Sequence, residues 1–141
     1  VAIEINPRLG GLYVNAAFRD VAAINPYHVY LSLLLGEQGI DVQLGAAVQK
    51  VADARQRYAM LAIYPDHSGH FKGIEGTGYL AENEQVLEYA QQEAGVYIDA
   101  DIEEHYLLKC WAKVDDAADA QALHDAIKQH LRVIIDMPDA G

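Results

Sequence analysis

The fold is decided by the stretch Val1-Ala2-Ile3-Glu4-Ile5-Asn6-Pro7-Arg8-Leu9-Gly10-Gly11. Its first residues alternate apolar and polar side chains, which predicts a β-strand with one apolar face and one polar face. Glu4 and Asn6 therefore point to the same side of this strand, one pleat repeat apart. Pro7 ends the strand because it has no backbone N–H to donate to a neighbour.

The polar side chains of this stretch suit a site for magnesium and phosphate. A carboxylate and an amide oxygen are hard ligands of the kind that Mg²⁺ prefers, and the ion keeps its other positions for water and substrate phosphates. Arg8 adds a planar, permanently charged group that binds phosphate or carboxylate. Gly10 and Gly11 allow a tight turn and a close approach of the backbone to a ligand. The alternative interpretation is a strand edge whose polar side chains are merely solvated.

The segment from Glu4 to Gly11 resembles the last catalytic segment of the ATP-grasp ligases. In that superfamily a Glu-x-Asn pair holds magnesium between the ATP phosphates, and the following arginine contacts the phosphates or an acyl-phosphate. The resemblance implies that Glu4 and Asn6 are metal ligands and that Arg8 is catalytic. It also implies that Arg8, Gly10 and Gly11 contribute to the nucleotide site, with ATP and Mg²⁺ (or Mn²⁺) as cofactors.

The same resemblance implies the C-terminal part of a carboxylate–amine ligase that acts through an acyl-phosphate and releases ADP. An L-amino-acid-ligase-like protein fits better than a biotin-carboxylase-like one, because the loop after Arg8 lacks the Gln-Val-Glu-His string of biotin carboxylases. The upstream ATP-binding residues of the family are not found in this sequence, so we expect the longer parent chain, and not this chain alone, to be the enzyme. The expected partners are small carboxylate and amine substrates, the missing N-terminal part of the same chain, and a second copy in a homodimer.

Length and composition fit one domain, or part of a larger one, of 141 residues with 52% hydrophobic residues. The net charge of −11, with only 10 Lys and Arg residues, argues against nucleic acid as a partner. No apolar stretch is long enough to span a membrane and no signal peptide is visible. The single cysteine, Cys110, excludes an internal disulfide and predicts a buried thiol in a reducing cytoplasm.

Residues 1–54 are expected to form the C-terminal portion of an ATP-grasp core. We predict an ordered loop with a helical turn from Leu12 to Ala23, which in ATP-grasp relatives lies over the acceptor substrate. Its polar residues are either substrate contacts or, preferably, ordinary loop residues: Asn15, Arg19 and Asp20.

A helix is predicted after this loop, with Asn25 as its N-cap and Pro26 at its first position. The helix over residues 27–37, whose end Gly36 and Gly39 mark, is apolar on most faces, which predicts that it is largely buried. Its first turn carries His28, which is either a substrate contact or, preferably, a packed or capping histidine. Residues 39–54 fit a short helix or an irregular connector equally well.

Residues 55–141 are expected to form a C-terminal α+β subdomain in the order β-β-α-β-β-α-β, with two helices on one small antiparallel sheet. The predicted elements are a β-hairpin of residues 57–64 and 70–76, a helix over 82–94, strands over 96–102 and 106–114, a helix over 117–131 capped by Asp115 and Asp116, and a strand over 132–136.

Two polar clusters in this half have alternative interpretations. One is either a metal site or, preferably, a solvated turn: Asp66, His67 and His70. The other is either a cation or amine site or, preferably, the solvated end of a hairpin: Asp99, Asp101, Glu103, Glu104 and His105. An alternative function for the whole chain is a non-catalytic α+β module for oligomerisation or ligand binding.

Overall fold

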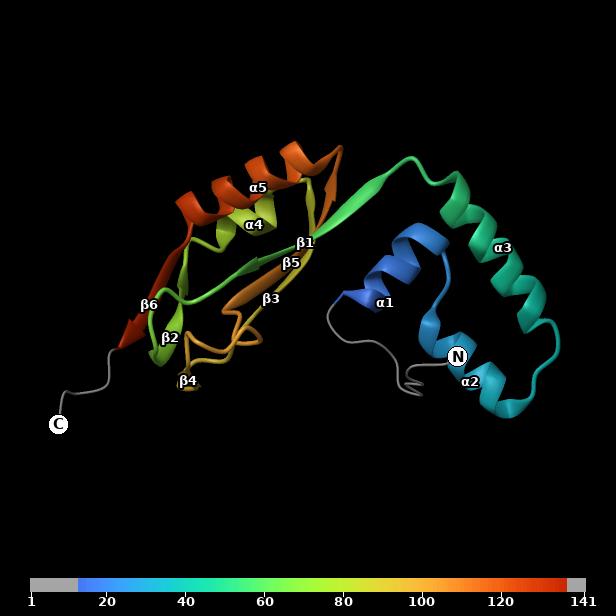
Figure 1. The fold of residues 1–141 in the computed structure, drawn as a ribbon, viewed down its shortest axis with the longest axis horizontal. Coiled ribbons are helices and arrows are strands. Elements are labelled where there is room, and N and C mark those ends of the chain that lie inside the picture. Colours follow the sequence, from blue (N-terminus) through green and yellow to red (C-terminus); the bar gives the residue numbers. More distant parts are fainter. Residues whose placement is uncertain (1–12, 137–141) are drawn as a thin grey trace. The chain divides into compact units, whose positions relative to one another are not determined.

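The structure, a computed structural model, describes residues 13–136. The chain divides into two compact units, Val1–Gln56 and Arg57–Gly141. The described part of the first unit is helical, and all the described strands belong to the second unit (Figure 1). The boundary lies close to the one expected after residue 54, but the assignment of the two units to parts of a ligase stays a prediction. Among the helices within residues 13–136, none is long and apolar enough to cross a bilayer.

The first unit begins with helical structure where the sequence predicted mostly loop. The helix α1 spans Val14–Ala17, and a π-helical segment, η1, continues it over Phe18–Ala22. The loop prediction is therefore wrong for most of this segment. Alanine is the best helix former, and the buried Ala16 and Ala22 also let the helical backbone pack closely.

The next helix, α2, spans Pro26–Leu35 and starts and stops as predicted. Its N-cap residue is Asn25, whose Oδ1 accepts hydrogen bonds from the backbone N–H groups of Tyr27 (2.9 Å) and His28 (3.3 Å). Gly36 ends the helix in the left-handed conformation, with φ of 68°, which glycine adopts without a steric penalty.

The prediction that α2 is largely buried is wrong. Four of its leucines are between 56% and 74% exposed, and its one buried residue is Ser32. The apolar side chains of α2 itself point out on most of its faces. A helix buries only the face that a neighbouring element covers. That neighbour within the unit is α3, which spans Ile40–Asp53 and resolves the ambiguity of this segment in favour of a helix.

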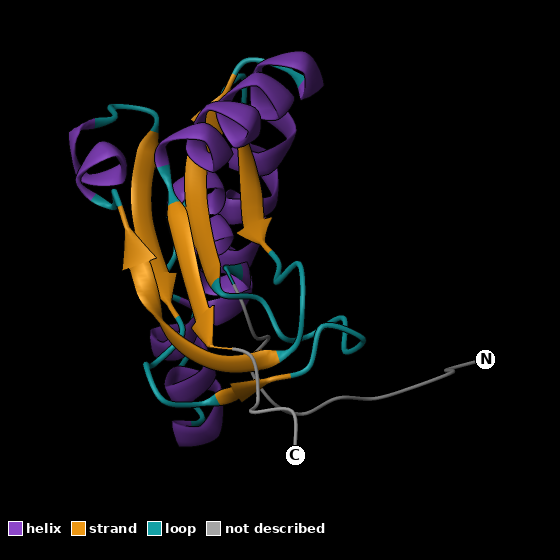
Figure 2. Cartoon of the chain, turned by 90° about the vertical axis from the view of Figure 1, so that its left-hand side faces the viewer, coloured by secondary structure: helices purple, strands orange, loops and turns teal. Residues whose placement is uncertain are grey.

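The second unit contains two three-stranded antiparallel sheets (Figure 2). The first sheet has the order β1 (Arg57–Ile63), β5 (Leu108–Val114), β3 (Val86–Gln91). The second has the order β4 (Tyr97–Ile98), β2 (Gly69–Glu75), β6 (Arg132–Asp136). The helices of this unit are α4 (Gly78–Glu82) and α5 (Ala117–His130). The predicted α+β class is confirmed, with two small sheets in place of one.

The predicted β-hairpin is wrong, although both of its strands exist. β1 pairs along its whole length with β5, from Arg57 opposite Val114 to Ile63 opposite Leu108. β2 instead pairs with β4 and β6 in the other sheet. The loop between β1 and β2 therefore carries the chain from one sheet to the other, and local sequence contains no signal for which strand a neighbour will join.

The predicted helix over residues 82–94 is also wrong. The short α4 ends at Glu82, and Asn83 forms a turn in which its Oδ1 accepts a hydrogen bond from the Gln85 N–H at 2.9 Å. β3 follows and pairs with β5. The cross-strand hydrogen bonds and packing outweigh the helical propensity of its Glu, Gln, Leu and Ala residues. The strand predicted over 96–102 is shorter than expected, since β4 contains two residues.

The core of the second unit lies between α5 and the first sheet (Figure 1). Asp116 caps α5 as predicted, because its Oδ1 accepts a hydrogen bond from the Asp119 N–H at 2.9 Å. The predicted apolar stripe of α5 is confirmed: Leu123 and Ile127 are buried, and Ala120 and Leu131 pack against the same cluster.

Candidate functional site

The predicted metal and nucleotide residues lie outside the described part of the chain. They are Glu4, Asn6, Arg8, Gly10 and Gly11. Their roles therefore stay predictions. The described part of the candidate site begins with the helical elements that follow them in the chain.

The segment directly after the motif is unusual in its backbone. The π-helical turn η1 (Phe18–Ala22) interrupts regular α-helical hydrogen bonding, and such turns are rare and frequent at functional sites. Ala23 then takes a left-handed conformation with φ of 55°. The candidate substrate contacts Arg19 and Asp20 both lie in this turn, so they belong to a π-helical segment and not to the ordered loop that the sequence predicted.

Arg19 and Asp20 form a two-point ion pair. Arg19 Nε donates to Asp20 Oδ1 at 2.8 Å, and Arg19 Nη2 donates to Asp20 Oδ2 at 2.9 Å. The Asp20 side chain is 18% exposed, so its carboxylate is fixed by this pair and partly shielded from water. A guanidinium held in this way keeps a fixed direction for its remaining N–H groups.

The side-chain nitrogen of Asn15 forms a hydrogen bond, whereas its side-chain oxygen forms none with the described residues. Its Nδ2 donates to the Tyr27 hydroxyl at 2.8 Å, which links α1 to α2. Its Oδ1 is buried and has no hydrogen-bond partner among residues 13–136. A buried acceptor without a donor costs about 1–3 kcal/mol, so each such atom requires an explanation. A substrate N–H group is the kind of donor that would satisfy it.

His28 does not behave as a site residue. It is exposed in the first turn of α2, and its backbone N–H donates to the Asn25 cap. This agrees with the preferred interpretation of a histidine that takes part in helix capping, here through its backbone. The sequence contains no signal for the role of Tyr27, whose hydroxyl accepts the hydrogen bond from Asn15, because the two residues are brought together only by the packing of α1 and α2.

The two polar clusters of the second unit do not form metal sites. Among residues 13–136, no group of three or more His, Cys, Asp or Glu side chains could hold a metal ion. In the cluster that follows β4, the Asp99 carboxylate accepts a hydrogen bond from the Asp101 N–H (3.0 Å), and His105 Nδ1 accepts one from the Asp99 N–H (2.9 Å). These bonds hold together a loop between β4 and β5, which favours the preferred interpretation of a solvated connection. The predicted hairpin is wrong, because β4 and β5 belong to different sheets.

Cys110 is a buried, unreactive thiol, as predicted. It is fully buried in β5 within the core of the second unit. Burial raises the pKa of the Cys110 thiol from 9.0 to about 11, and a hydrogen bond with the Leu61 backbone offsets part of this rise. At neutral pH the group is a neutral thiol and not a nucleophile.

The fold of the chain is similar to parts of two solved structures. It is similar to a crystal structure of an L-amino acid ligase from Bacillus licheniformis, with a TM-score of 0.66 and 16% identity over 92% of this chain. It is also similar to a phosphoribosylglycinamide synthetase from Anaerococcus prevotii, with a TM-score of 0.61 and 16% identity over 88% of this chain. Both are ATP-grasp enzymes, so the predicted ATP-grasp resemblance is confirmed at the level of fold.

The similarity covers only a part of those enzymes. The chain spans 31% of the length of the L-amino acid ligase and 30% of the length of the synthetase. No family model and no curated protein sequence matches the chain.

Proposed function

We propose that the chain is part of an ATP-dependent ligase that joins a small carboxylate to an amine. The observation that carries this proposal is the fold, which resembles an L-amino acid ligase over 92% of the chain. The Glu4-to-Gly11 segment supports it independently, because its residue types suit magnesium and phosphate. The residues that precede the motif in the family would come from the N-terminal part of the same protein.

In this proposal the residues of the opening segment have distinct roles. Glu4 and Asn6 would hold Mg²⁺, which neutralises phosphate charge when bound. Arg8 would bind the phosphates and the acyl-phosphate, and Gly10 and Gly11 would let the backbone approach the nucleotide. The carboxylate oxygen attacks the terminal phosphorus of ATP, which gives an acyl-phosphate and ADP. The amine then attacks the acyl carbon and releases phosphate, so that one C–N bond forms for each ATP cleaved.

The described residues add a position for the amine. Asn15 Oδ1 is a buried acceptor for which the described residues supply no donor, and Arg19 is held in a fixed direction by Asp20. We assign Asn15 Oδ1 to an N–H of the amine substrate and Arg19 to an anionic group of the substrates. A reducing cytoplasm is the compartment that the single cysteine suggests.

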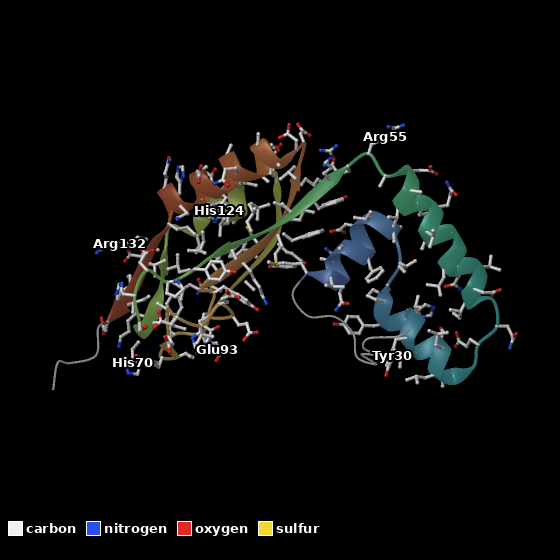
Figure 3. All side chains as sticks on the ribbon, viewed as in Figure 1. Tyr30, Arg55, His70, Glu93, His124 and Arg132 are labelled. Carbon is white, nitrogen blue, oxygen red and sulfur yellow. The ribbon has the colours of Figure 1, made fainter. Side chains whose placement is uncertain are left out.

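The test is ADP release that depends on an added amino acid, measured on the protein that contains this chain. Glu4→Gln should lower this rate at least about a hundredfold, because even outer partners of metal ligands contribute roughly 10–100-fold. The matched control is Glu93→Gln, which removes an equal charge from an exposed position of the second unit (Figure 3) and should leave the rate unchanged. Equal rates in the wild type and Glu4→Gln would overturn the assignment.

A further inference from the structure

A cavity of about 300 Å³ lies in the second unit, whereas the proposed ligase residues belong to the first unit. Its apolar wall consists of Ile63 at the end of β1, Leu131 directly after α5, and Val133 and Ile135 on β6. This volume is at the lower end of the range for small-molecule sites, about 300–1,000 Å³. At about 30 Å³ for each water-sized group, it holds roughly ten non-hydrogen atoms.

The cavity lies at the edges of the two sheets. β1 is an outer strand of the first sheet and β6 is an outer strand of the second. Each therefore has an edge that no other described strand covers. On the β1 edge, the Ala62 carbonyl lies 3.0 Å from Nε2 of His124, which projects from α5 (Figure 3). Ala62 and His124 are not part of the cavity lining. The strand edges of β1 and β6 that no described strand covers can contact a ligand.

Basic side chains from three elements line the polar side of this cavity. Lys128 comes from the last turn of α5, Arg132 from the start of β6, and His67 from the loop after β1. Asp66 is the one acidic residue of the lining. The chain as a whole has a net charge of −11 and only 10 Lys and Arg residues. The cavity lining therefore differs from the rest of the chain in having more basic than acidic side chains.

The two permanent cations are available to a ligand. Within residues 13–136, Lys128 forms no ion pair with a carboxylate. Arg132 Nη1 lies 3.7 Å from Glu75 Oε2, but the two side chains are 79% and 62% exposed, so the pair is long and weak. Lys128 also lies where the helix dipole favours a cation, but that explanation does not extend to Arg132 and His67, which belong to other elements.

We propose that this cavity binds a small monocarboxylate with an apolar body. The hydrocarbon part packs against Ile63, Leu131 and Val133, and the carboxylate is bound by Lys128 and Arg132. This proposal does not rest on the ligase function, since the site is built from the second unit alone.

The test is a titration of the whole chain with 3-phenylpropanoate, followed by amide NMR. Shifts are expected to concentrate in residues 63–67 and 128–135. The neutral 3-phenylpropan-1-ol and the cationic 3-phenylpropylamine have the same apolar body, and they should bind at least about tenfold more weakly, since they lack the charge that the two cations attract.

Two variants test the charged side of the cavity. Lys128→Met and Arg132→Met, which keep an apolar stem, should each weaken 3-phenylpropanoate binding about fivefold, and together roughly twentyfold, as expected for partly exposed charge pairs. Lys113→Met is the matched control, because it removes the same charge from an exposed position on β5 outside the cavity and should leave the affinity unchanged.

Four results would overturn the proposal. Equal binding of the alcohol would mean that the cavity recognises only an apolar body. Tighter binding of the amine would mean that Asp66 and the C-terminal end of α5 select a cation. Unchanged affinity in the double variant would remove Lys128 and Arg132 from the site. Absence of shifts in the named residues at about 10 mM ligand would leave no site of useful affinity. Both substituted residues are exposed, so the variants are expected to fold, and their amide spectra check this directly.

Discussion

The two units of the chain differ in where they keep their apolar side chains. In the second unit, large side chains are fully buried in two clusters, with Ile127 between α5 and the first sheet and Phe71 and Leu107 among residues of the strands. In the described part of the first unit, the buried apolar residues are three alanines and Ile40, while the leucines of α2 are exposed. Burial of large apolar side chains contributes about 1.5–3 kcal/mol each. The second unit therefore has a core of its own, and residues 13–56 have little of one.

This difference explains why similar sequence patterns have different consequences in the two units. The apolar stripe of α5 and the apolar surface of α2 both predicted burial, but only α5 has a sheet to pack against. An apolar face indicates that a helix can be buried, and the elements that neighbour the helix determine whether it is buried. In the proposed function, the rest of the ligase supplies the neighbours of α2.

The largest expected effect comes from the core of the second unit. Ile127→Ala should lower the free energy of unfolding of that unit by about 4 kcal/mol, because it leaves a cavity at a fully buried position. Leu34→Ala is the counterpart on α2, where the side chain is 66% exposed, and should change the stability of α2 by less than about 0.5 kcal/mol. Urea unfolding followed by Trp111 fluorescence measures the first change, and amide hydrogen exchange in α2 measures the second. Equal losses from the two substitutions would mean that the α2 surface is buried in solution.

The next effect concerns the buried thiol and its pH dependence. Because the pKa of Cys110 is about 11 in the folded chain and 9.0 for an ordinary thiol, the unfolded chain loses this proton first. Stability from this group is fully present below pH 9 and is lost as the pH rises from 9 towards 11, where the native thiol is still protonated and the unfolded one is ionised. At pH 8 the native thiol should also react with iodoacetamide at least about a hundredfold more slowly than the unfolded chain, as two pKa units imply.

The control for this prediction is Cys110→Ala, because lysines and tyrosines titrate in the same pH range. The urea midpoint of the wild type should fall more between pH 8 and pH 10.5 than that of Cys110→Ala. Parallel midpoints would show that Cys110 titrates normally, and hence that β5 opens readily.

The smallest effect comes from the two helix caps. Asp116→Ala should destabilise the second unit by about 1 kcal/mol, since the side chain caps α5. Asn25→Ala removes the equivalent cap of α2 and should speed amide exchange in α2 without changing exchange in β5 or α5. Residue-resolved hydrogen exchange separates the two. Faster exchange in β5 after Asn25→Ala would show that the two units unfold together.

Features that depend on neighbouring residues were predictable from the sequence. The cap at Asn25, the helix end at Gly36 and the cap at Asp116 each need only a few consecutive residues, and all three are confirmed. The hairpin of β1 and β2 and the helix over residues 82–94 were wrong for the opposite reason. Strand pairing joins residues far apart in the chain, and Val86 becomes part of a strand because Ala112 lies opposite it.

The candidate site shows the same division. Residue types alone suggested magnesium and phosphate chemistry for Glu4, Asn6 and Arg8, which lie outside the described residues, and this chemistry stays a prediction. Sequence also pointed to Asn15, Arg19 and Asp20, but only the structure showed the ion pair of Arg19 with Asp20 and the unpartnered Asn15 oxygen. Lys128 and Arg132 gave no signal in the sequence, because the cavity between them is formed by elements distant from one another in the chain.

The sequence by itself determined the α+β class, the helix caps, the buried cysteine and the resemblance to ATP-grasp ligases, since these depend on residue type and short spacing. Only the tertiary structure decided that there are two sheets, that η1 is a π-helix, that α2 is exposed and that a cavity with basic groups lies between β1 and β6. The physical reason is that each of these is fixed by contacts between distant segments, whose free energies exceed the small local preferences of the chain.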